Sequence, residues 1–285
     1  MTIDGATAVV TGGASGIGAA LAVGLIARGA RVVVADLDPV ATGEAVAALP
    51  PGTAIAVAGD TADPAVVDAQ IAAAEQHFGP VDYYFANAGI AGAAGLAATD
   101  EEWAAALGVN LLAHVRAARA LVSGWVARGS GHFVVTASAA GLLSQVGSAT
   151  YSTTKHAAVG FAEWLALTYG DDGVRVSCVC PMGVDTPLLR PERDVDDDEA
   201  LMLHTVESAG AVLSPAEVAA VVLDAVEEGT FLILPHPEVL DMYRGKGADY
   251  ERWLGGMRKL QRGMRRSLRP NTPSPTPEGT VSGRE

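Results

Sequence analysis

Tyr151 and Lys155, with Ser138 thirteen positions upstream of the tyrosine, are the residues whose types and spacing best suit chemistry. On a helix, a four-residue step places Tyr151 and Lys155 on one face, one turn apart. A tyrosine hydroxyl has a reference pKa of about 10, and a nearby ammonium group lowers that pKa because it favours the phenolate. Bringing the pKa to about 7 requires roughly 4 kcal/mol of differential stabilisation. The pair then suits proton exchange with an alcohol or carbonyl, although the spacing alone also fits an ordinary exposed helix.

A glycine-rich turn near the N-terminus supplies a second chemical signal. The segment Thr11–Gly18 lies between a short apolar strand, residues 6–11, and an apolar helical pattern that ends before Gly29. Such a turn lets the backbone approach a pyrophosphate, and the helix that follows offers free N–H groups and a partial positive charge. The strand–turn–helix context therefore favours a dinucleotide site over a turn without a ligand.

Asp36 lies about twenty residues beyond the glycines, at the end of the second predicted strand. A carboxylate at this position can bond a ribose diol and would repel a 2′-phosphate. No cation stands where such a phosphate would need one, because Ser15 lies in the glycine loop and Leu37 follows Asp36. The sequence therefore predicts NAD rather than NADP as the cofactor.

Together these residues resemble the short-chain dehydrogenase/reductase family, over roughly residues 4–236. Thr11–Gly18 is similar to the family's Thr-Gly-x-x-x-Gly-x-Gly loop, and Asn87-Ala88-Gly89 to its Asn-Ala-Gly motif. Asp60 matches an acidic residue that contacts the adenine ring in the family, and Pro181–Thr186 resembles its Pro-Gly motif. The resemblance implies a catalytic tetrad of Asn110, Ser138, Tyr151 and Lys155.

The resemblance also implies a role for each tetrad residue in alcohol oxidation. Tyr151 takes the hydroxyl proton, Ser138 holds the substrate oxygen, and Lys155 lowers the Tyr151 pKa and binds the nicotinamide ribose. Asn110 positions a water that links Lys155 to solvent. The residues expected to bind NAD are Gly12, Ser15, Gly16, Ile17, Gly18, Asp36, Leu37, Asp60, Thr61, Asn87, Ala88, Gly89, Tyr151, Lys155, Pro181, Gly183, Val184 and Thr186.

The expected substrate pocket is mostly apolar. Its predicted residues are Ser138, Leu142, Leu143, Gln145, Met182, Leu188 and Leu189. No arginine clearly belongs to this set, which favours a hydrophobic secondary alcohol or ketone, alicyclic or steroid-like, over a carboxylate or phosphate. We expect no metal, because no His, Cys or Asp spacing suggests one, and the six histidines have no assigned chemistry.

Alternating strands and helices must position these residues. Strands are expected near 6–11, 31–36, 53–58, 82–86, 132–138, 174–180 and 231–235, and helices near 16–28, 39–49, 64–77, 100–128, 150–170, 215–228 and 237–267. This alternation predicts an α/β fold: a doubly wound, Rossmann-type parallel sheet of about seven strands, covered by helices on both faces. The carboxyl ends of the strands then gather the motifs along one edge, where such sheets bind ligands.

Composition limits the class of protein. The 285 residues are 49% hydrophobic and only 5% aromatic, which suits one large core built from Ala, Val and Leu. Cys178 and Cys180 lie in a strand-like run and are expected to be small core residues in a reducing compartment. Because the N-terminus lacks a signal-peptide pattern and residues 5–27 contain the glycine loop, we expect a cytoplasmic protein without a membrane span.

The C-terminal region differs in charge from the rest of the chain. Residues 241–269 contain nine Lys or Arg and three Asp or Glu, whereas the whole chain has a net charge of −14. Tyr250, Trp253, Met257, Leu260 and Met264 form one apolar helix face, so a basic amphipathic helix is expected over 237–269. It fits a lid over the substrate cleft, an arm on a neighbouring subunit, or a helix on its own acidic body. The acidic remainder argues against a membrane or nucleic acid as its partner.

The expected organisation is a catalytic domain over 1–236, the basic helix over 237–269 and a disordered tail over 270–285. A further mobile element is expected between Pro187 and Ser214, around the acidic run 191–199, with apolar flanks facing the substrate. The family commonly assembles through helices 100–128 and 150–170, which implies a homotetramer, with a dimer as the alternative. The sparsely charged faces expected to allow close helix approach contain Ala104, Ala105, Ala117, Ala118, Ala157 and Ala158.

Two other function classes remain open from the sequence. One is a sugar-nucleotide epimerase or dehydratase of the extended relatives, which share Tyr-x-x-x-Lys. The other is a dinucleotide-sensing protein without turnover. The Thr11-Gly12-Gly13 and Asn87-Ala88-Gly89 motifs favour the dehydrogenase branch, and the intact tetrad favours turnover.

Overall fold

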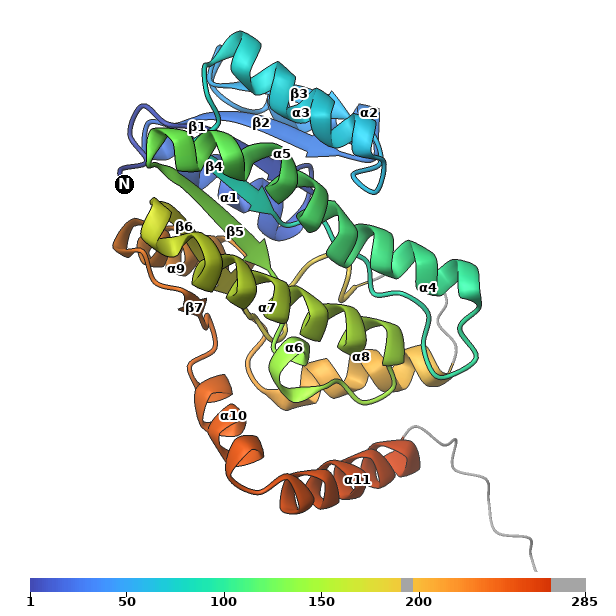
Figure 1. Cartoon of the computed structure of the whole chain (residues 1–285). Coiled ribbons are helices and arrows are strands. Elements are labelled where there is room, and N and C mark those ends of the chain that lie inside the picture. The colour runs from blue at the N-terminus through green and yellow to red at the C-terminus, as the bar shows by residue number, and fades with distance from the viewer. Residues whose placement is uncertain (191–196, 268–285) are drawn as a thin grey trace, which may run out of the picture.

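A parallel sheet with helices on both faces forms the body of the protein (Figure 1). The computed structural model describes residues 1–190 and 197–267. Most of the predicted acidic run 191–199 and the whole predicted tail 270–285 lie outside the described residues. The strands are β1 Thr7–Thr11, β2 Arg31–Asp36, β3 Ala54–Ala58, β4 Tyr83–Ala86, β5 Gly131–Thr136, β6 Val174–Val179 and β7 Leu232–Ile233.

The strand order is β3-β2-β1-β4-β5-β6-β7, and every pairing is parallel. The chain runs outward from β1 to β3, then crosses back beside β1 with β4. This reversal between β1 and β4 is the topological switch point at which doubly wound sheets bind ligands. The predicted fold class is confirmed, including the seven strands and their expected places in the sequence.

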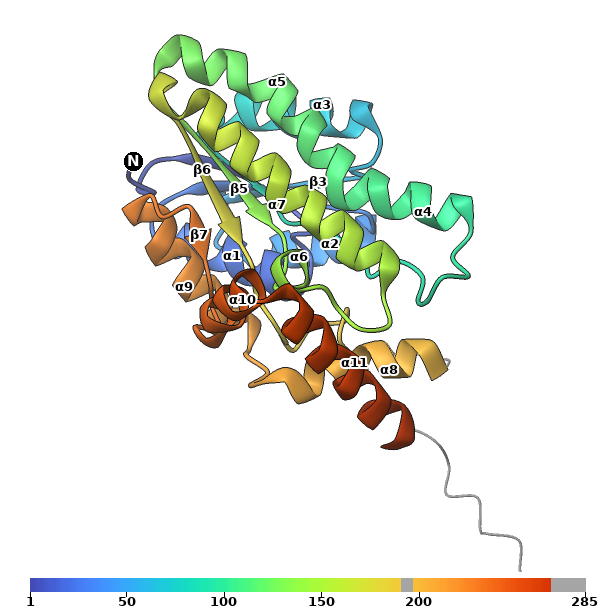
Figure 2. The same cartoon turned by 60° about the horizontal axis from the view of Figure 1, so that its bottom comes forward.

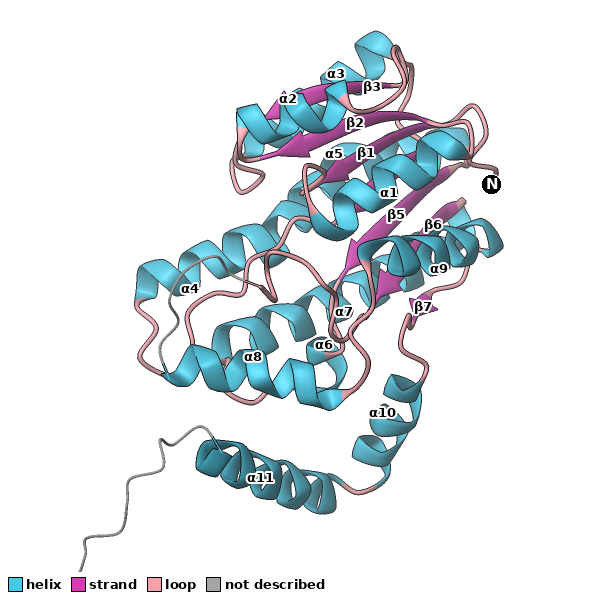
Figure 3. Cartoon of the chain, turned by 180° about the vertical axis from the view of Figure 1, so that it is seen from behind, coloured by secondary structure: helices cyan, strands magenta, loops and turns pink. Residues whose placement is uncertain are grey.

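The helices are α1 Gly16–Ala27, α2 Pro39–Ala47, α3 Pro64–His77, α4 Asp100–Leu107, α5 Ala113–Arg128, α6 Ala140–Leu143, α7 Ala149–Tyr169, α8 Asp197–Ala209, α9 Pro215–Glu228, α10 Glu238–Ala248 and α11 Tyr250–Ser267. A π-helical turn, η1 Gly108–Leu112, joins α4 to α5, and a 3₁₀ turn, η2 Gly170–Asp172, follows α7. Figure 3 shows the same elements from behind.

Side-chain alternation along the strands produces two separate cores. Val9, Val33 and Phe133 point to the face covered by α3, α5 and α7. The neighbouring Val10, Val34 and Val134 point to the face packed against α1 and α9. Because both faces of the sheet are covered, its strands are apolar on both sides, as expected of a parallel sheet.

The alanine-rich helix faces that were predicted to allow close approach of subunits lie only partly on the surface. Ala117 and Ala118 on α5, and Ala158 on α7, pack in the protein's own core rather than on its surface. By length and composition alone, 100–128 could cross a membrane. In this fold its second half packs in the core through Leu121, Val122 and Trp125.

The C-terminal helix is also two helices rather than one. α10 ends before Asp249, whose backbone is extended (φ −153°), and α11 begins at Tyr250. The Asp249 carboxylate accepts a hydrogen bond from the Arg252 N–H at 2.9 Å and so caps α11. The pair leaves the sheet beyond β7, and α11 runs beside α8 (Figure 2).

Candidate active site

The carboxyl ends of the strands bring the predicted motifs to one edge of the sheet. The glycine loop follows β1, Asp36 ends β2, Asn87 follows β4 and Ser138 follows β5. Pro181 follows β6. The parallel register of these strands places all five segments on the same side of the fold.

The glycine loop has the backbone that a phosphate-binding turn requires. Gly12 and Gly16 adopt positive φ angles of 64° and 52°, a region that side chains disfavour. At Gly18 a Cβ atom would lie 2.0 Å from the Gly12 carbonyl oxygen, so only glycine fits. The Ser15 side chain makes no capping bond to α1, which leaves the first N–H groups of this helix available to an anion. This loop therefore fits the pyrophosphate of a dinucleotide.

Asp36 is positioned to meet a ribose. Its Oδ2 accepts a hydrogen bond from the Ala14 N–H at 2.9 Å, and its Oδ1 accepts one from the Leu37 N–H at 2.7 Å. The carboxylate thus holds the glycine loop against the end of β2 and retains lone pairs for a diol. Leu37 beside it is 68% exposed and offers no cation. The geometry agrees with the NAD preference predicted from sequence.

Thr11 joins the glycine loop to the Asn-Ala-Gly motif. Its hydroxyl donates to the Phe85 carbonyl at 3.2 Å and accepts from the N–H groups of Asn87 and Ala88, both at 3.0 Å. The Asn87 amide donates to the Thr11 carbonyl at 3.0 Å. These bonds hold β1 and β4 together at the switch point. Farther along the edge, the Asp60 carboxylate accepts from the Ala62 N–H at 2.8 Å, while Thr61 is buried.

Tyr151 and Lys155 lie on α7, whose N-terminus is capped by the Ser148 hydroxyl. The Lys155 ammonium is buried, donates to the Thr136 carbonyl at 2.8 Å, and lies 5.6 Å from the centre of the Tyr151 ring. The predicted pairing on one helix face is therefore present. The strand β5 ends at Thr136, so this single bond also ties α7 to the strand that leads to Ser138.

Burial opposes the predicted effect of Lys155 on the Tyr151 pKa. Burial raises the pKa of Tyr151 above its ordinary value, and a hydrogen bond from Ser138 offsets only part of that rise. Burial also lowers the pKa of Lys155 to about 8. The physical reason is that an apolar surround penalises both charged forms, and the ammonium already bonds a neutral carbonyl.

Asn110 lies in the π-helical turn η1, a kind of distortion that is frequent at functional sites. Its amide accepts from the Ile90 N–H and donates to the Ile90 carbonyl, both at 2.9 Å. It also donates to the Thr154 hydroxyl at 3.0 Å. A Cβ atom on Gly89 would lie 3.3 Å from both the Asn110 amide oxygen and the Lys155 ammonium. The tetrad and the Asn-Ala-Gly motif thus converge, and Gly89 leaves the space between them.

The predicted pocket residues lie on three segments after β5 and β6. Leu142 and Leu143 form the buried short helix α6, and Gln145 follows it. The Gln145 amide donates to the Met202 carbonyl at 3.3 Å, which links this segment to α8. Beyond β6, Leu189 is buried while Leu188 is exposed, so these two predicted neighbours point in different directions.

His236 is a structural residue of the site that sequence reasoning missed. Its Nδ1 accepts from the Met182 N–H at 3.1 Å, so its Nε2 carries the proton and donates to the Ala211 carbonyl at 3.1 Å. The imidazole thereby joins the Pro-Gly segment to the chain that follows α8. Thr154 was missed in the same way, since only its contact with Asn110 reveals its place. A histidine just beyond the last strand was the one available signal, and it does not specify a partner.

Comparison with known proteins places this architecture among relatives. A family model described as short chain dehydrogenase matches residues 6–197. Momilactone A synthase from Oryza sativa subsp. japonica is 36% identical over 235 residues, which cover 80% of this chain and 86% of that protein. A 2,5-dichloro-2,5-cyclohexadiene-1,4-diol dehydrogenase from Sphingobium indicum is 36% identical over 223 residues, 76% of this chain and 88% of that protein.

A solved structure gives the same result for the fold. A short chain dehydrogenase/reductase from Burkholderia phymatum, in complex with NAD, superposes with a TM-score of 0.77. The two chains are 32% identical, and the match covers 88% of this chain and 96% of the other.

Proposed function

This chain belongs to the short-chain dehydrogenase family and is an NAD-dependent oxidoreductase, and we propose that it interconverts a hydrophobic, alicyclic secondary alcohol and its ketone. The observation that most supports the proposal is the convergence of Ser138, Tyr151 and Lys155 beside Gly89, in the segment whose Ala88 lies against Gly12 of the glycine loop. In this arrangement a proton-transferring hydroxyl lies next to a dinucleotide site, which is what alcohol oxidation requires.

Some of the tetrad residues transfer the proton, and the others orient the substrate and the helices that carry the site. Bound NAD supplies the hydride acceptor for oxidation and, when reduced, the hydride donor for reduction. Tyr151 takes the proton of the substrate hydroxyl in oxidation and returns it in reduction, while the Ser138 hydroxyl holds the same oxygen. Lys155 contributes positive charge beside the phenolate, and its pKa of about 8 allows it to pass a proton near neutral pH. Asn110 fixes the π turn and α7 in place through Ile90 and Thr154.

The cofactor is held by the carboxyl edge of the sheet. The N–H groups at the start of α1 would bind the pyrophosphate, and Asp36 would bind the adenosine ribose. Asp60 and Thr61 would contact the adenine, while Asn87 to Gly89 and Pro181 to Thr186 would hold the nicotinamide half.

Several observations favour a hydrophobic substrate. Leu142, Leu143 and Leu189 contribute apolar walls near Ser138, and the segment after β6 adds Met182. The Sphingobium indicum relative is named as acting on a cyclohexadiene diol, a ring alcohol. A pocket with apolar walls and few polar groups suits such a ring, because apolar contact supplies the binding and one hydroxyl supplies the orientation.

We further propose a cytoplasmic homotetramer, with a dimer as the alternative. Trp164 and Leu167 on α7 are 52% and 87% exposed, which is unusual for large apolar side chains and supports an interface on this helix. Within the chain, residues 1–236 form the catalytic domain, and 237–269 form a separate basic extension whose net charge opposes that of the body.

A screen of secondary alcohols tests the proposed function. The protein is incubated with NAD and a panel that includes cyclic, open-chain and carboxylated alcohols, and NADH formation is followed. The proposal expects turnover with cyclic apolar alcohols and weaker turnover with carboxylated ones. Turnover restricted to charged substrates would overturn the substrate class, and epimerisation of a sugar nucleotide without net NADH formation would favour the alternative enzyme class.

A further inference from the structure

Lys246 is a buried cation outside the tetrad. It lies on α10, its side chain belongs to a residue only 7% exposed, and its ammonium donates to the Leu142 carbonyl at 2.6 Å. Among residues 1–190 and 197–267, no ion pair with a carboxylate is found for it, although its ammonium lies 5.6 Å from the centre of the Tyr250 ring. Burying an ammonium without a counter-ion costs free energy. The groups that the ammonium contacts indicate which segments Lys246 positions.

The partner of Lys246 is the segment that follows Ser138. Leu142 belongs to the last turn of α6, where backbone carbonyls have no partner within the helix. A cation at the C-terminal end of a helix satisfies such a carbonyl and complements the helix dipole. Directly after α6, Ser144 adopts a φ of 67°, a left-handed conformation that a non-glycine residue adopts only when its surroundings hold it there. Lys246 therefore supports a strained wall of the site.

Lys246 also contacts the helix that contains Tyr151. The His156 Nδ1 lies 2.8 Å from the Ser152 carbonyl, so it donates to this acceptor and leaves Nε2 as a lone pair. That Nε2 lies 3.4 Å from the Lys246 ammonium. Since His156 directly follows Lys155, one ammonium from α10 links α6, which forms the substrate wall, to α7, which bears the acid–base pair.

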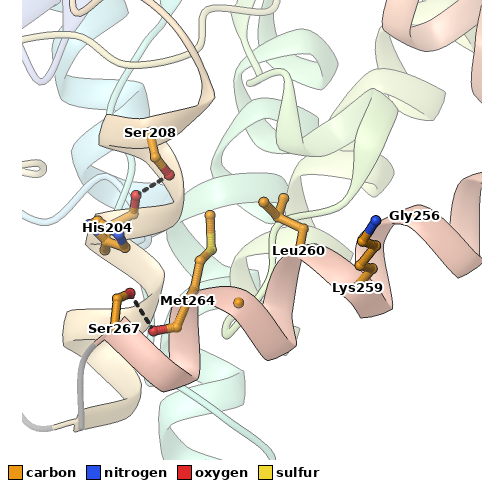
Figure 4. Close-up of a pocket in the computed structure, with 8 residues that line it drawn as sticks. His204, Ser208, Gly256, Lys259, Leu260, Met264 and Ser267 are labelled. Atoms are coloured by element: carbon orange, nitrogen blue, oxygen red, sulfur yellow. Dashed lines mark hydrogen bonds between the residues drawn. The ribbon is translucent and has the colours of Figure 1, made fainter.

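The same C-terminal extension reaches the other wall through α11. Met264 is buried against α8, and its sulfur lies 3.3 Å from the Thr205 hydroxyl. Figure 4 shows Met264 and Leu260 of α11 opposite His204 and Ser208 of α8, along a groove of about 540 Å³. The groove itself contains none of the predicted substrate residues, so α11 contacts α8 outside the predicted pocket.

We infer that Lys246 is a positioning residue for substrate binding, which fixes α6 against α7 by bonding the Leu142 carbonyl and His156. The inference rests on the proposed function, because it takes α6 as a wall of the alcohol site. None of the residues expected to hold NAD lies on α10, so we expect the effect on the alcohol rather than on NAD. The class of ligand affected is the bulky apolar alcohol that contacts Leu142 and Leu143.

Lys246→Met tests the inference, because methionine keeps the length and apolar stem but removes the donor. Lys259→Met is the matched control, since Lys259 is exposed on α11 and makes no hydrogen bond to the described residues. We expect Lys246→Met to raise KM for the alcohol about tenfold, the factor that ~1.4 kcal/mol represents, with kcat and KM for NAD unchanged. Lys259→Met should leave all three quantities unchanged, and Lys246→Arg, which keeps a donor, should restore most of the alcohol affinity.

Hydrogen–deuterium exchange of residues 139–148 provides a readout that needs no turnover. Exchange in this segment should be faster in Lys246→Met than in the wild type, and unchanged in Lys259→Met. If Lys246→Met does not yield folded protein, Lys246→Gln, whose amide is too short to reach Leu142, replaces it in both measurements.

Two results would overturn the inference. One is an exchange rate and an alcohol KM equal to those of the wild type. The other is a lower Tm and kcat together with equal rises in KM for the alcohol and for NAD. The second result would mean that Lys246 serves stability alone. A wild-type protein that oxidises no alcohol would refute the proposed function, yet faster exchange confined to 139–148 in Lys246→Met would still support the positioning contact.

Discussion

Burial sets the charge state of the reacting side chains. Tyr151 has a raised pKa and Lys155 a lowered pKa of about 8, so burial favours the neutral form of both side chains. Any group that favours the phenolate must therefore act against desolvation. The Ser138 hydroxyl already does so, because its hydrogen bond lowers the Tyr151 pKa.

Cofactor choice is predicted to reside in two adjacent residues. Asp36→Ala combined with Leu37→Arg removes a ribose partner and a repulsive charge, and adds a cation for the 2′-phosphate. We expect kcat/KM to fall with NAD and to rise with NADP. Steady-state kinetics with both cofactors measure the change, and Leu37→Met serves as a control without charge. A wild-type enzyme that already prefers NADP would contradict the role assigned to Asp36.

His114 is predicted to make the protein sensitive to acid. It is 2% exposed, neither ring nitrogen has a partner among the described residues, and burial, followed by the Lys155 charge, lowers its pKa to about 3. In the unfolded chain the His114 imidazole binds a proton as the pH falls through about 6.5, whereas in the folded protein it does so only near pH 3. The contribution of His114 to the free energy of unfolding is therefore fully present above pH 6.5 and is lost as the pH drops from there towards 3.

His114→Leu should reduce this acid sensitivity. At pH 5 the depressed pKa accounts for about 2 kcal/mol of lost stability, from the 1.5-unit gap at ~1.36 kcal/mol per unit. Urea unfolding at pH 8 and pH 5 is compared at one protein concentration for wild type, His114→Leu and the exposed control His77→Asn. If His114→Leu loses as much stability between pH 8 and pH 5 as the wild type does, His114 is not the source of the acid sensitivity.

Among the elements, the π turn η1 has the clearest link to function. It interrupts the long helix at Asn110 and directs that amide toward Ile90 and Thr154. Asn110→Ala should leave the Ile90 N–H and carbonyl without their partner. We expect a loss of about 1–3 kcal/mol in stability and a lower kcat, because α7 loses a support next to Lys155.

The comparison for this change is Thr154→Val, which removes one hydroxyl and keeps both bonds to Ile90. Urea unfolding and kcat are measured for both variants. A smaller effect of Thr154→Val is expected on both quantities. Equal effects would mean that the contact with Ile90 contributes nothing beyond the contact with Thr154.

Much of the element pattern is predictable from sequence, for physical reasons that also explain the misses. Strands β1 to β4 lie within about one residue of their predicted bounds, because apolar runs between glycines and prolines have few other solutions. The short helix α6 was missed because four residues contain no helical period. The helix α8 was missed because the acidic run that overlaps its start suggested a loop. The break at Asp249 was missed because the apolar face that predicted the helix begins only at Tyr250 and gives no information about the residues before it.

Some residues of the candidate site could be predicted from the sequence and others could not. Side chains in local motifs, such as Tyr151 and Lys155, are recognisable from spacing on one helix. His236 and Lys246 act through partners 25 to 104 residues away, so no local pattern reveals them. The size of the burial effect on the Tyr151 pKa could not be predicted, because the sequence shows the neighbouring cation but not the burial that acts on both groups.

At the scale of the whole molecule, the acidic body and the basic extension oppose each other. The apolar face of α11 is only partly covered, with Tyr250, Leu254 and Leu260 each exposed. We predict a homotetramer in full-length protein and a loss of stability or mass on truncation after Pro237. Burial of apolar surface stabilises by roughly 25 cal/mol per Å², so loss of the side chains that α10 and α11 bury should remove several kcal/mol of packing or assembly free energy.

Light scattering of full-length and truncated protein, with unfolding and activity assays, measures this effect. A monomeric full-length enzyme would refute the predicted assembly. A truncated protein with unchanged mass, stability and kinetics would mean that α10 and α11 serve neither the site nor an interface.

The central claim, that Tyr151 transfers the substrate proton in an NAD-dependent alcohol oxidation, is tested most directly by Tyr151→Phe. Only the hydroxyl is lost, so the ring keeps its place 5.6 Å from Lys155 and the cofactor edge is untouched. With the best cyclic alcohol and NAD, we predict a fall in kcat of at least about 100-fold, while NADH binding measured by fluorescence stays within about twofold. A variant that binds NADH and still turns over at a rate near wild type would contradict the account.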